Sequence, residues 1–216
     1  MKSMSFDQKK LWDKIYKEET FHPLYLRESK FAKECIKYLP KNSKILELGC
    51  GLGKDAIFFA KRGHFVVALD FSKEAIKKAK KNAKKQKIKN ILFINRDISK
   101  KFNFRDFSFD VVYANLSLHY FTEEVTEKIF SEAARVLKKK GLFCVRCRSI
   151  KDLLYGKGKL IERNIYIFNG HLRHFFSKKE FKRRLKKKFK IKKLQTEKIK
   201  FKNEIWMFVK VIAAKI

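Results

Sequence analysis

Three glycines spaced two residues apart, with an acidic residue before them, form the segment of this chain best suited to ligand chemistry. Residues 44–55 have the sequence KILELGCGLGKD, and the apolar residues 56–60 follow. This pattern predicts a strand, a tight glycine turn and the start of a helix. Glycine permits positive φ and lets a ligand lie against the backbone, and the first turn of a helix offers unpaired N–H groups. The turn is therefore a candidate binding site.

An acidic residue also follows the next predicted strand. Residues 64–69, HFVVAL, are typical of a buried strand, and Asp70 comes directly after them. At the end of the second strand of a strand–helix–strand unit, a carboxylate can accept hydrogen bonds from both ribose hydroxyls of a nucleoside. The two segments together indicate a cofactor that contains a nucleoside.

Two cofactor patterns compete for the glycine turn. The dinucleotide pattern GxGxxG or GxGxxA is matched in its weaker form by residues 51–56, GLGKDA. The pattern of an acidic residue followed by GxGxG is matched throughout by residues 47–53. The second match resembles motif I of the class I S-adenosylmethionine-dependent methyltransferases. Within that superfamily, residues 51–60 and 70–72 are similar to the small tellurite-resistance-like and related small-molecule methyltransferases.

The resemblance implies a set of cofactor contacts. Asp70 takes the place of the family's ribose-binding acid. Asp97 lies just past a predicted third strand at 91–95 and takes the place of the residue that binds the adenine amino group. The end of the predicted fourth strand, 109–114, should border the transferred methyl group, because ligands in open α/β sheets bind at the strand ends. The implied cofactor-binding residues are Glu47, Gly49, Gly51, Gly53, Asp70, Phe71, Asp97, Ile98, Asn115 and Tyr16.

A predicted N-terminal helix, residues 6–19, carries Tyr16 and Trp12 four residues apart. Many methyltransferases of this class close such a helix over the cofactor, and on this resemblance Tyr16 belongs to the lid. For Trp12 we expect ordinary core packing. A second predicted helix, 24–39, ends at Pro40.

His119, shortly after the predicted fourth strand, is the candidate catalytic residue, because imidazole can act as a general base near neutral pH. A single histidine after a strand is also often a packed or hydrogen-bonding side chain, so both interpretations remain open. Residues 115–121 have the sequence NLSLHYF and lack an NPPY-type motif. Such a motif would resemble that of methyltransferases that act on the amino groups of adenine or glutamine. The chain's two prolines, Pro23 and Pro40, exclude a Pro-Cys nucleophile of the cytosine-C5 type.

The least regular stretch, residues 151–176, is a candidate wall for the methyl acceptor. It contains a short hairpin around residues 165–168 and the turn Asn169-Gly170. The polar and aromatic residues expected to face the acceptor are Tyr155, Arg163, His171 and Arg173.

These segments and the resemblance together imply one doubly wound α/β domain with a seven-stranded, mostly parallel sheet, helices on both faces and an antiparallel last strand. Two strands after the last helix suit the reversed hairpin that ends the methyltransferase sheet, whereas a nicotinamide domain has no such ending. The expected parts are a helical lid (1–43), a cofactor-binding core (44–150), an acceptor-side insert (151–176) and a final helix with strands (177–216).

The net charge of +33 has two interpretations. A basic surface can bind nucleic acid, but an abundance of Lys, Phe, Ile and Asn is also what an AT-rich genome produces. Two basic segments, 73–89 and 178–193, have apolar residues at helical spacing. The resemblance implies that these two helices cover opposite faces of the sheet. Charge spread in this way favours composition over a nucleic-acid groove, with weak non-specific binding to nucleic acid expected.

We expect no metal, because Cys144 and Cys147 would point to opposite faces of one strand and no second pair is present. Four cysteines, no signal-peptide pattern and no bilayer-spanning apolar run predict a cytoplasmic protein without membrane contact. The expected activity is methyl transfer from S-adenosylmethionine to an N, O or S atom of a small molecule. The alternatives are an RNA methyltransferase, an NAD-dependent oxidoreductase and a non-enzymatic nucleic-acid-binding protein.

Overall fold

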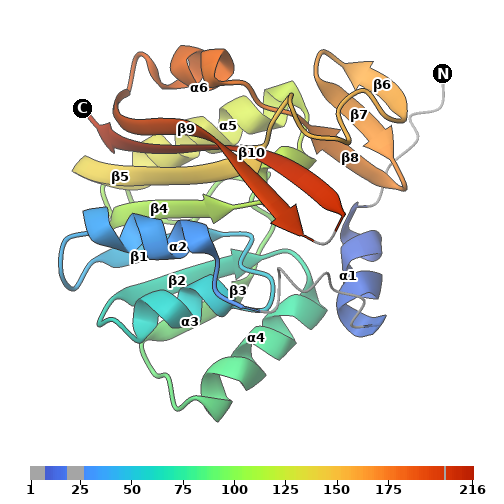
Figure 1. The fold of residues 1–216 in the computed structure, drawn as a ribbon. Helices are drawn as coiled ribbons and strands as arrows, with labels where there is room; N and C mark the ends of the chain where they lie inside the picture. Colours follow the sequence, from blue (N-terminus) through green and yellow to red (C-terminus); the bar gives the residue numbers. More distant parts are fainter. Residues whose placement is uncertain (1–7, 19–26, 202) are drawn as a thin grey trace.

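A seven-stranded sheet forms the centre of the computed structural model, which describes residues 8–18, 27–201 and 203–216 (Figure 1). The strand order is β3-β2-β1-β4-β5-β10-β9. The strands are β1 (Lys44–Leu48), β2 (Phe65–Asp70), β3 (Ile91–Asn95), β4 (Phe109–Asn115), β5 (Leu137–Arg148), β9 (Phe189–Phe201) and β10 (Glu204–Lys215). The pairs among β1 to β5 are parallel, and β10 is antiparallel to both β5 and β9. The predicted fold class is confirmed.

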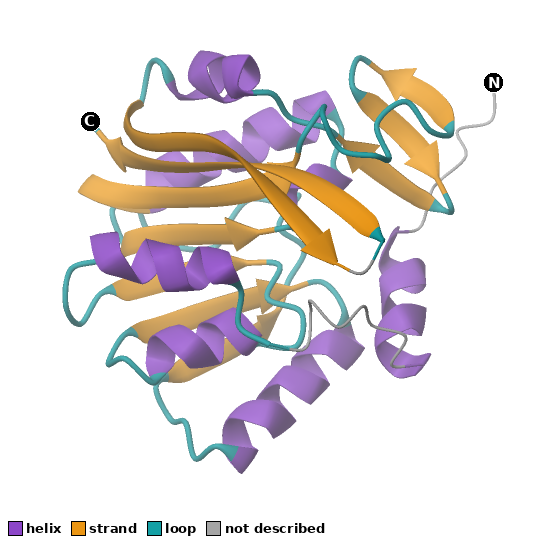
Figure 2. Ribbon diagram, viewed as in Figure 1, coloured by secondary structure: helices purple, strands orange, loops and turns teal. Residues whose placement is uncertain are grey.

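Helices cover both faces of this sheet (Figure 2). The helices are α1 (Gln8–Glu18), α2 (Lys30–Cys35), η2 (Ile36–Tyr38), α3 (Lys54–Ala60), α4 (Lys73–Lys85), η3 (Leu118–Tyr120), α5 (Glu123–Val136) and α6 (Lys178–Leu185). Adjacent strand residues such as Ile45 and Leu46 belong to two different core clusters, because strand side chains alternate between faces. The cluster of Ile45 contains α2, α3 and α4, and the cluster of Leu46 contains α5 and α6.

Hydroxyl side chains fix where four of these helices begin. In each case the hydroxyl oxygen accepts a hydrogen bond from a backbone N–H three residues later, which satisfies one of the unpaired donors of the first turn. The four capping residues are Ser29, Ser72, Thr122 and Ser177. Ser72 and Ser177 stand directly before the two basic segments with helical spacing, where serine favours the start of a helix.

The last basic segment departs from its predicted course. Helical spacing predicts a helix over 178–193, but α6 ends at Leu185 and β9 begins at Phe189. Strand β9 pairs with β10 along almost its whole length, so backbone hydrogen bonds across the pair replace the helical ones. The predicted second helix is also shorter, since α2 and η2 cover Lys30–Tyr38 and residues 24–26 lie outside the described part of the chain.

The insert forms a small sheet of its own, with strands β6 (Lys159–Glu162), β7 (Ile165–Phe168) and β8 (His171–His174) in that order. The predicted turn between β7 and β8 is present, with φ of 47° at Asn169 and 74° at Gly170. Positive φ at both central residues is typical of a two-residue hairpin turn. Among the described residues, no helix is both long enough and apolar enough to cross a membrane.

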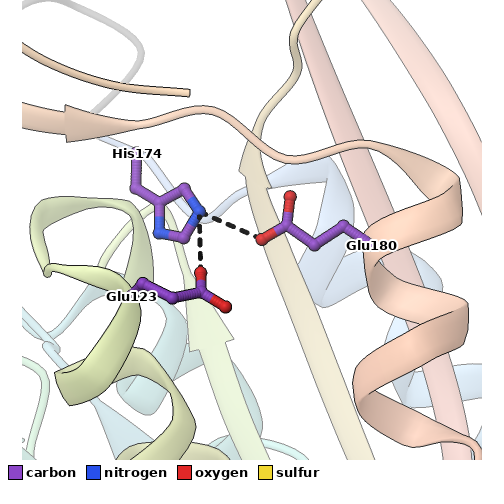
Figure 3. Close-up of side chains that lie close together, drawn as sticks. All are labelled: Glu123, His174 and Glu180. Atoms are coloured by element: carbon purple, nitrogen blue, oxygen red, sulfur yellow. Dashed lines mark ion pairs between the residues drawn. The ribbon is translucent and has the colours of Figure 1, made fainter. Parts of the chain in front are cut away.

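A cluster of ionisable side chains joins this insert to the two helices α5 and α6, which cover the main sheet (Figure 3). The Nε2 atom of His174 at the end of β8 lies 3.0 Å from Glu180 Oε1 on α6 and 3.8 Å from Glu123 Oε2 on α5. Burial raises the pKa of Glu180, but hydrogen bonds from His174 and Arg184 lower it below its ordinary value. The cluster therefore joins β8 to two helices.

The same three side chains offer atoms within 4.8 Å of one another, as metal ligands would. Arg184, however, has no exposed side-chain surface, and its Nη2 donates to Glu180 Oε1 at 2.8 Å and also to Glu123. The carboxylate oxygens thus already accept hydrogen bonds from a cation of the same chain. We interpret the cluster as a structural clamp.

Replacing Arg184 by Met should destabilise the fold by about 3 kcal/mol, because removal of one partner leaves the others of a buried ion pair uncompensated. Urea unfolding measures this change as a shift in the midpoint. The matched control is Arg183→Met. Arg183 contacts the same Glu123 but is 60% exposed, so its loss should cost less than about 1 kcal/mol. Equal shifts for the two variants would contradict the clamp.

Candidate functional site

A cavity of about 770 Å³ lies at the carboxyl ends of the parallel strands. Residues that follow β1, β2, β3 and β4 line it, together with residues from α1, from the insert and from the start of β10. Its size is within the range of small-ligand sites, and its place matches the rule for open α/β sheets.

The glycine turn after β1 forms part of the cavity wall. Gly49 has φ of 74°, and a Cβ there would lie 2.4 Å from the Cβ of Ser117. Gly51 has φ of 52°, and its Cβ would lie 2.7 Å from the hydroxyl oxygen of Tyr16 on α1. A side chain at Gly49 would therefore separate β1 from the β4 loop, and one at Gly51 would enter the space between the turn and α1. Gly53 caps α3 against Phe93 and does not line the cavity.

Asp70 ties this turn to the end of β2. Its carboxylate accepts hydrogen bonds from the backbone N–H groups of Gly51, at 2.8 Å, and Ser72, at 2.9 Å. Burial raises the pKa of Asp70 to about 6, against the effect of those hydrogen bonds, and Asp13 adds to the rise. The carboxylate is thus held in place at the cavity while its charge is only partly compensated.

Glu47 is a second buried acid of the cavity, 3% exposed. Its Oε2 atom has no hydrogen-bond partner among the described residues. Burial raises the pKa of Glu47 well above its ordinary value, and the charges of Asp55 and Asp70 raise it further. A ligand that brings a donor or a positive charge would satisfy this carboxylate, since an unpaired buried acceptor is costly.

Asp55, which sequence reasoning missed, organises the site from the first turn of α3. It accepts hydrogen bonds from the backbone N–H and the hydroxyl of Ser29, from the hydroxyl of Tyr113 and from the amide of Asn115, at 2.7–3.0 Å. Burial and the charge of Asp55 raise the pKa of Tyr113. Its only sequence signal is an acid in the first turn of a helix, where acids are common.

Further predicted cofactor residues line the cavity beside these. Phe71, Asp97, Ile98 and Asn115 are at its wall. Asp97 is exposed, and its Oδ1 accepts a hydrogen bond from the N–H of Ser99 at 2.8 Å. Ile98 is buried. Apart from Gly53, the residues predicted to bind the cofactor are therefore brought to one cavity.

Helix α1 covers the cavity and carries Trp12 and Tyr16 on its wall. The hydroxyl of Ser72 donates a hydrogen bond to Asp13, which joins α1 to the start of α4. The expectation that Trp12 belongs to the core is wrong, because none of the α1 side chains is fully buried. The ring of Trp12 instead lies beside those of Tyr120 and His171, with centroids 5.2 and 5.4 Å away.

The structure does not bring His119 to the cavity. It is 1% exposed, is not among the lining residues, and neither ring nitrogen has a hydrogen-bond partner in the described part of the chain. Burial, together with the charges of nearby Arg148 and Arg173, lowers the pKa of His119 well below its ordinary value. A side chain so enclosed cannot reach a substrate in this cavity.

The four predicted acceptor residues divide into two pairs. His171 and Arg173 on β8 line the cavity, whereas Tyr155 and Arg163 do not. The hydroxyl of Tyr155 donates to Asn164 at 2.9 Å, and its ring packs against other rings of the insert. Arg163 is exposed in the β6–β7 turn. Lining residues that sequence reasoning missed include Arg148, Leu154 and Trp206.

Comparison with known proteins agrees with this geometry. Residues 45–141 match a family model described as a methyltransferase domain. The chain is 30% identical over 148 residues to phosphoethanolamine N-methyltransferase 1 of Triticum aestivum, which covers 64% of this chain and 30% of that protein. It is 31% identical over 128 residues to an uncharacterized methyltransferase of Synechocystis, covering 59% of this chain and 54% of that protein. The chain thus spans about a third to a half of these relatives.

Solved structures resemble the fold over more of the chain. A methyltransferase from Methanosarcina mazei, described as S-adenosylmethionine-dependent, has a TM-score of 0.74 and 24% identity, covering 85% of this chain and 97% of that one. The 1,6-didemethyltoxoflavin-N1-methyltransferase of Burkholderia thailandensis, solved with bound S-adenosylhomocysteine, has a TM-score of 0.76 and 17% identity, covering 96% and 86%. The family match favours S-adenosylmethionine over a dinucleotide at the glycine turn. Residues 45–141 thus match a methyltransferase domain, and the whole sheet has the fold of solved structures described as S-adenosylmethionine-dependent methyltransferases.

Proposed function

We propose that this protein transfers the methyl group of S-adenosylmethionine to an N, O or S atom of a small-molecule acceptor. The observation that carries the proposal is the cavity itself. The glycine turn and the acids Asp70 and Asp97 line one side of it, and the insert residues His171 and Arg173 line another. Cofactor and acceptor could therefore bind in one space.

The cavity residues fit this cofactor. Asp70 would bind the ribose, Asp97 and Ile98 the adenine, and the backbone of the glycine turn would lie against the cofactor. Glu47, whose Oε2 lacks a partner among the described residues, would bind the positively charged part. When bound, S-adenosylmethionine supplies a methyl group already activated by a sulfonium, so the protein needs mainly to align the acceptor and exclude water.

The chain's own residues could perform both tasks. Asn115 is held at the end of β4 by two hydrogen bonds, one donated to Asp55 and one accepted from Arg146. Helix α1 covers the cavity and would limit the access of water. Such alignment does not require a strong base, and in this proposal His119 has no catalytic role.

A small molecule suits this cavity better than RNA. The relatives named above include enzymes whose names give phosphoethanolamine and a toxoflavin precursor as acceptors. An uncharacterized RNA methyltransferase of Protochlamydia amoebophila is 37% identical, but over 60 residues, or 28% of this chain. The basic helices α4 and α6 lie on opposite faces of the sheet, so their charge does not converge on the cavity.

Replacing Asp70 by Asn should weaken binding of S-adenosylhomocysteine by about 2 kcal/mol, because a charge-assisted pair of hydrogen bonds is lost. Isothermal titration calorimetry gives the affinity, and Asp106→Asn, at an exposed acid paired with Arg135, is the matched control. The proposal predicts no comparable binding of NAD. Tight binding of NAD without any response to S-adenosylhomocysteine would refute it.

Cofactor affinity should also depend on pH through Asp70. The pKa of this buried acid is raised to about 6, so the carboxylate that accepts the ribose hydroxyls is progressively protonated as the pH falls below 6. A proton must then leave on binding, and affinity should fall by up to about tenfold per pH unit. Titrations between neutral and acidic pH measure this slope. Asp70→Asn should remove it, and a slope unchanged in that variant would assign the titration to another group.

RNA should not be an acceptor. Charge-driven RNA binding should be weak and independent of sequence, and should be largely lost near about 0.15 M salt, because counterions screen phosphate contacts. Incubation of total RNA with labelled S-adenosylmethionine at that salt measures methyl incorporation. We expect none, and label in one particular RNA would favour the alternative of an RNA methyltransferase.

A further inference from the structure

Two groups of charged residues line different parts of the cavity, which Lys9, Arg27, Lys54, Asp97 and Glu204 also line. The acids Glu47, Asp55 and Asp70 lie at the ends of β1 and β2 and at the start of α3. The arginines Arg148, at the end of β5, and Arg173, on β8, lie toward the insert. We call the second group, with the neighbouring His171 on β8, the basic end of the cavity.

The two arginines of the basic end lie close enough to His171 and His119 to act on both. Burial, together with the charges of Arg173 and Arg148, lowers the pKa of His171 to about 4. The same two arginines act on His119, which lies behind the cavity wall. His171 is therefore neutral at pH 7, and its Nδ1 has no hydrogen-bond partner among the described residues.

Within the described part of the chain, Arg148 forms an ion pair with Asp152. Arg148 Nη1 donates to Asp152 Oδ1 at 2.9 Å. The oxygens of Asp152 also accept hydrogen bonds from the N–H groups of Leu154, at 3.1 Å, and Met207, at 2.9 Å. The buried ion pair with Asp152 therefore holds Arg148 in position, and the charge of Arg148 still lowers the pKa of His171.

Aromatic rings line the same end. The ring centroid of Trp12 lies 5.2 Å from that of Tyr120 and 5.4 Å from that of His171, and Tyr120 and His171 are 5.8 Å apart. These rings come from α1, η3 and β8. The ring of Trp206 on β10 lies 5.1 Å from the guanidinium of Arg148. All four rings border the cavity and form what we call its aromatic wall.

We propose that the methyl acceptor is a planar molecule with an anionic group, such as an aromatic carboxylate, and that it binds between the aromatic wall and the basic end. This inference rests on the proposed function, because it names the class of acceptor for the same cavity. The acceptor's ring would pack on the wall, and its anion would face the arginines.

The physical reasons are specific to these side chains. A carboxylate accepts charge-assisted hydrogen bonds from guanidinium groups, and the planar fork of arginine matches its geometry. A flat ring can stack on or meet the edges of the wall's rings. A cationic acceptor group would be repelled by Arg148 and Arg173. The acidic end, by contrast, suits the positive charge of the cofactor.

The two tryptophans of the chain, Trp12 and Trp206, both line the cavity, so tryptophan fluorescence reports its occupancy. The protein is saturated with S-adenosylhomocysteine and then titrated separately with four compounds. Two are anions, 4-hydroxybenzoate and phenyl phosphate, one is the uncharged methyl ester of 4-hydroxybenzoate, and one is the cation tyramine. We expect 4-hydroxybenzoate to bind at least about tenfold more tightly than its ester, from the loss of one charge-assisted contact. Tyramine should bind most weakly.

The variant Arg173→Gln should weaken 4-hydroxybenzoate binding by about tenfold and leave the ester's affinity unchanged. Arg163→Gln is the matched control, since Arg163 is an exposed arginine of the same insert outside the cavity. The affinity for S-adenosylhomocysteine is measured in every variant as a test of folding. If Arg173→Gln fails that test, the comparison of acid and ester on the unmodified protein decides the question.

The outcomes separate this inference from the proposed function. If S-adenosylhomocysteine binds but the acid binds no better than the ester, or not at all, the anionic acceptor is refuted and the methyltransferase proposal stands. If S-adenosylhomocysteine itself does not bind, the proposed function fails. An equal loss of acid affinity in Arg163→Gln would refute the basic end as the anion site. Phenyl phosphate binding better than 4-hydroxybenzoate would identify the anion as a phosphate.

Discussion

The buried carboxylate of Asp55 is the constraint on which the cavity depends. A charge held away from water is costly unless hydrogen bonds satisfy it. Asp55, 6% exposed, accepts them from Ser29, Tyr113 and Asn115, so α2 and β4 are fixed relative to α3. The start of α3, and with it the glycine turn, therefore takes one position against the end of β4.

The same network continues across the sheet to its last strands. Asn115 accepts a hydrogen bond from Arg146, which donates to Glu197 on β9, and Lys210 on β10 donates to Glu197 at 3.0 Å. Each buried charge in this series has an opposite charge or a hydrogen-bond partner. Glu47 differs, because one of its oxygens has no partner among the described residues. A network whose polar groups all have hydrogen-bond partners within the chain stabilises the fold. A buried acid at a cavity that lacks such a partner can accept a hydrogen bond from a ligand instead.

The cavity is also asymmetric, and this asymmetry links the fold to the proposed chemistry. Parallel strands end at its acidic side, where helix starts and the glycine turn present N–H groups. The insert supplies His171 and Arg173 of the basic end, and β5 supplies Arg148. The four rings of the aromatic wall come from α1, η3, β8 and β10. The clamp of His174, Glu180 and Arg184 holds the insert on α5 and α6. The position of the insert residues that line the cavity therefore depends on contacts outside the cavity. Variation in the insert could therefore change the acceptor without altering the cofactor side.

The sequence by itself determined the elements whose signals are local. The glycine turn, Asp70 at the end of β2, the caps at Ser72 and Ser177 and the turn Asn169-Gly170 depend on neighbouring residues. The seven-stranded sheet with its final hairpin was predicted from these segments together with the family resemblance. Only the tertiary structure decided which side chains meet across the cavity. Asp55, Trp12, Arg148 and Trp206 belong to elements far apart in the chain, and His119 is near the site yet enclosed. The end of α6 was likewise decided by the pairing of β9 with β10. Spacing along the chain fixes which face a residue occupies, but packing between distant elements determines what that face meets.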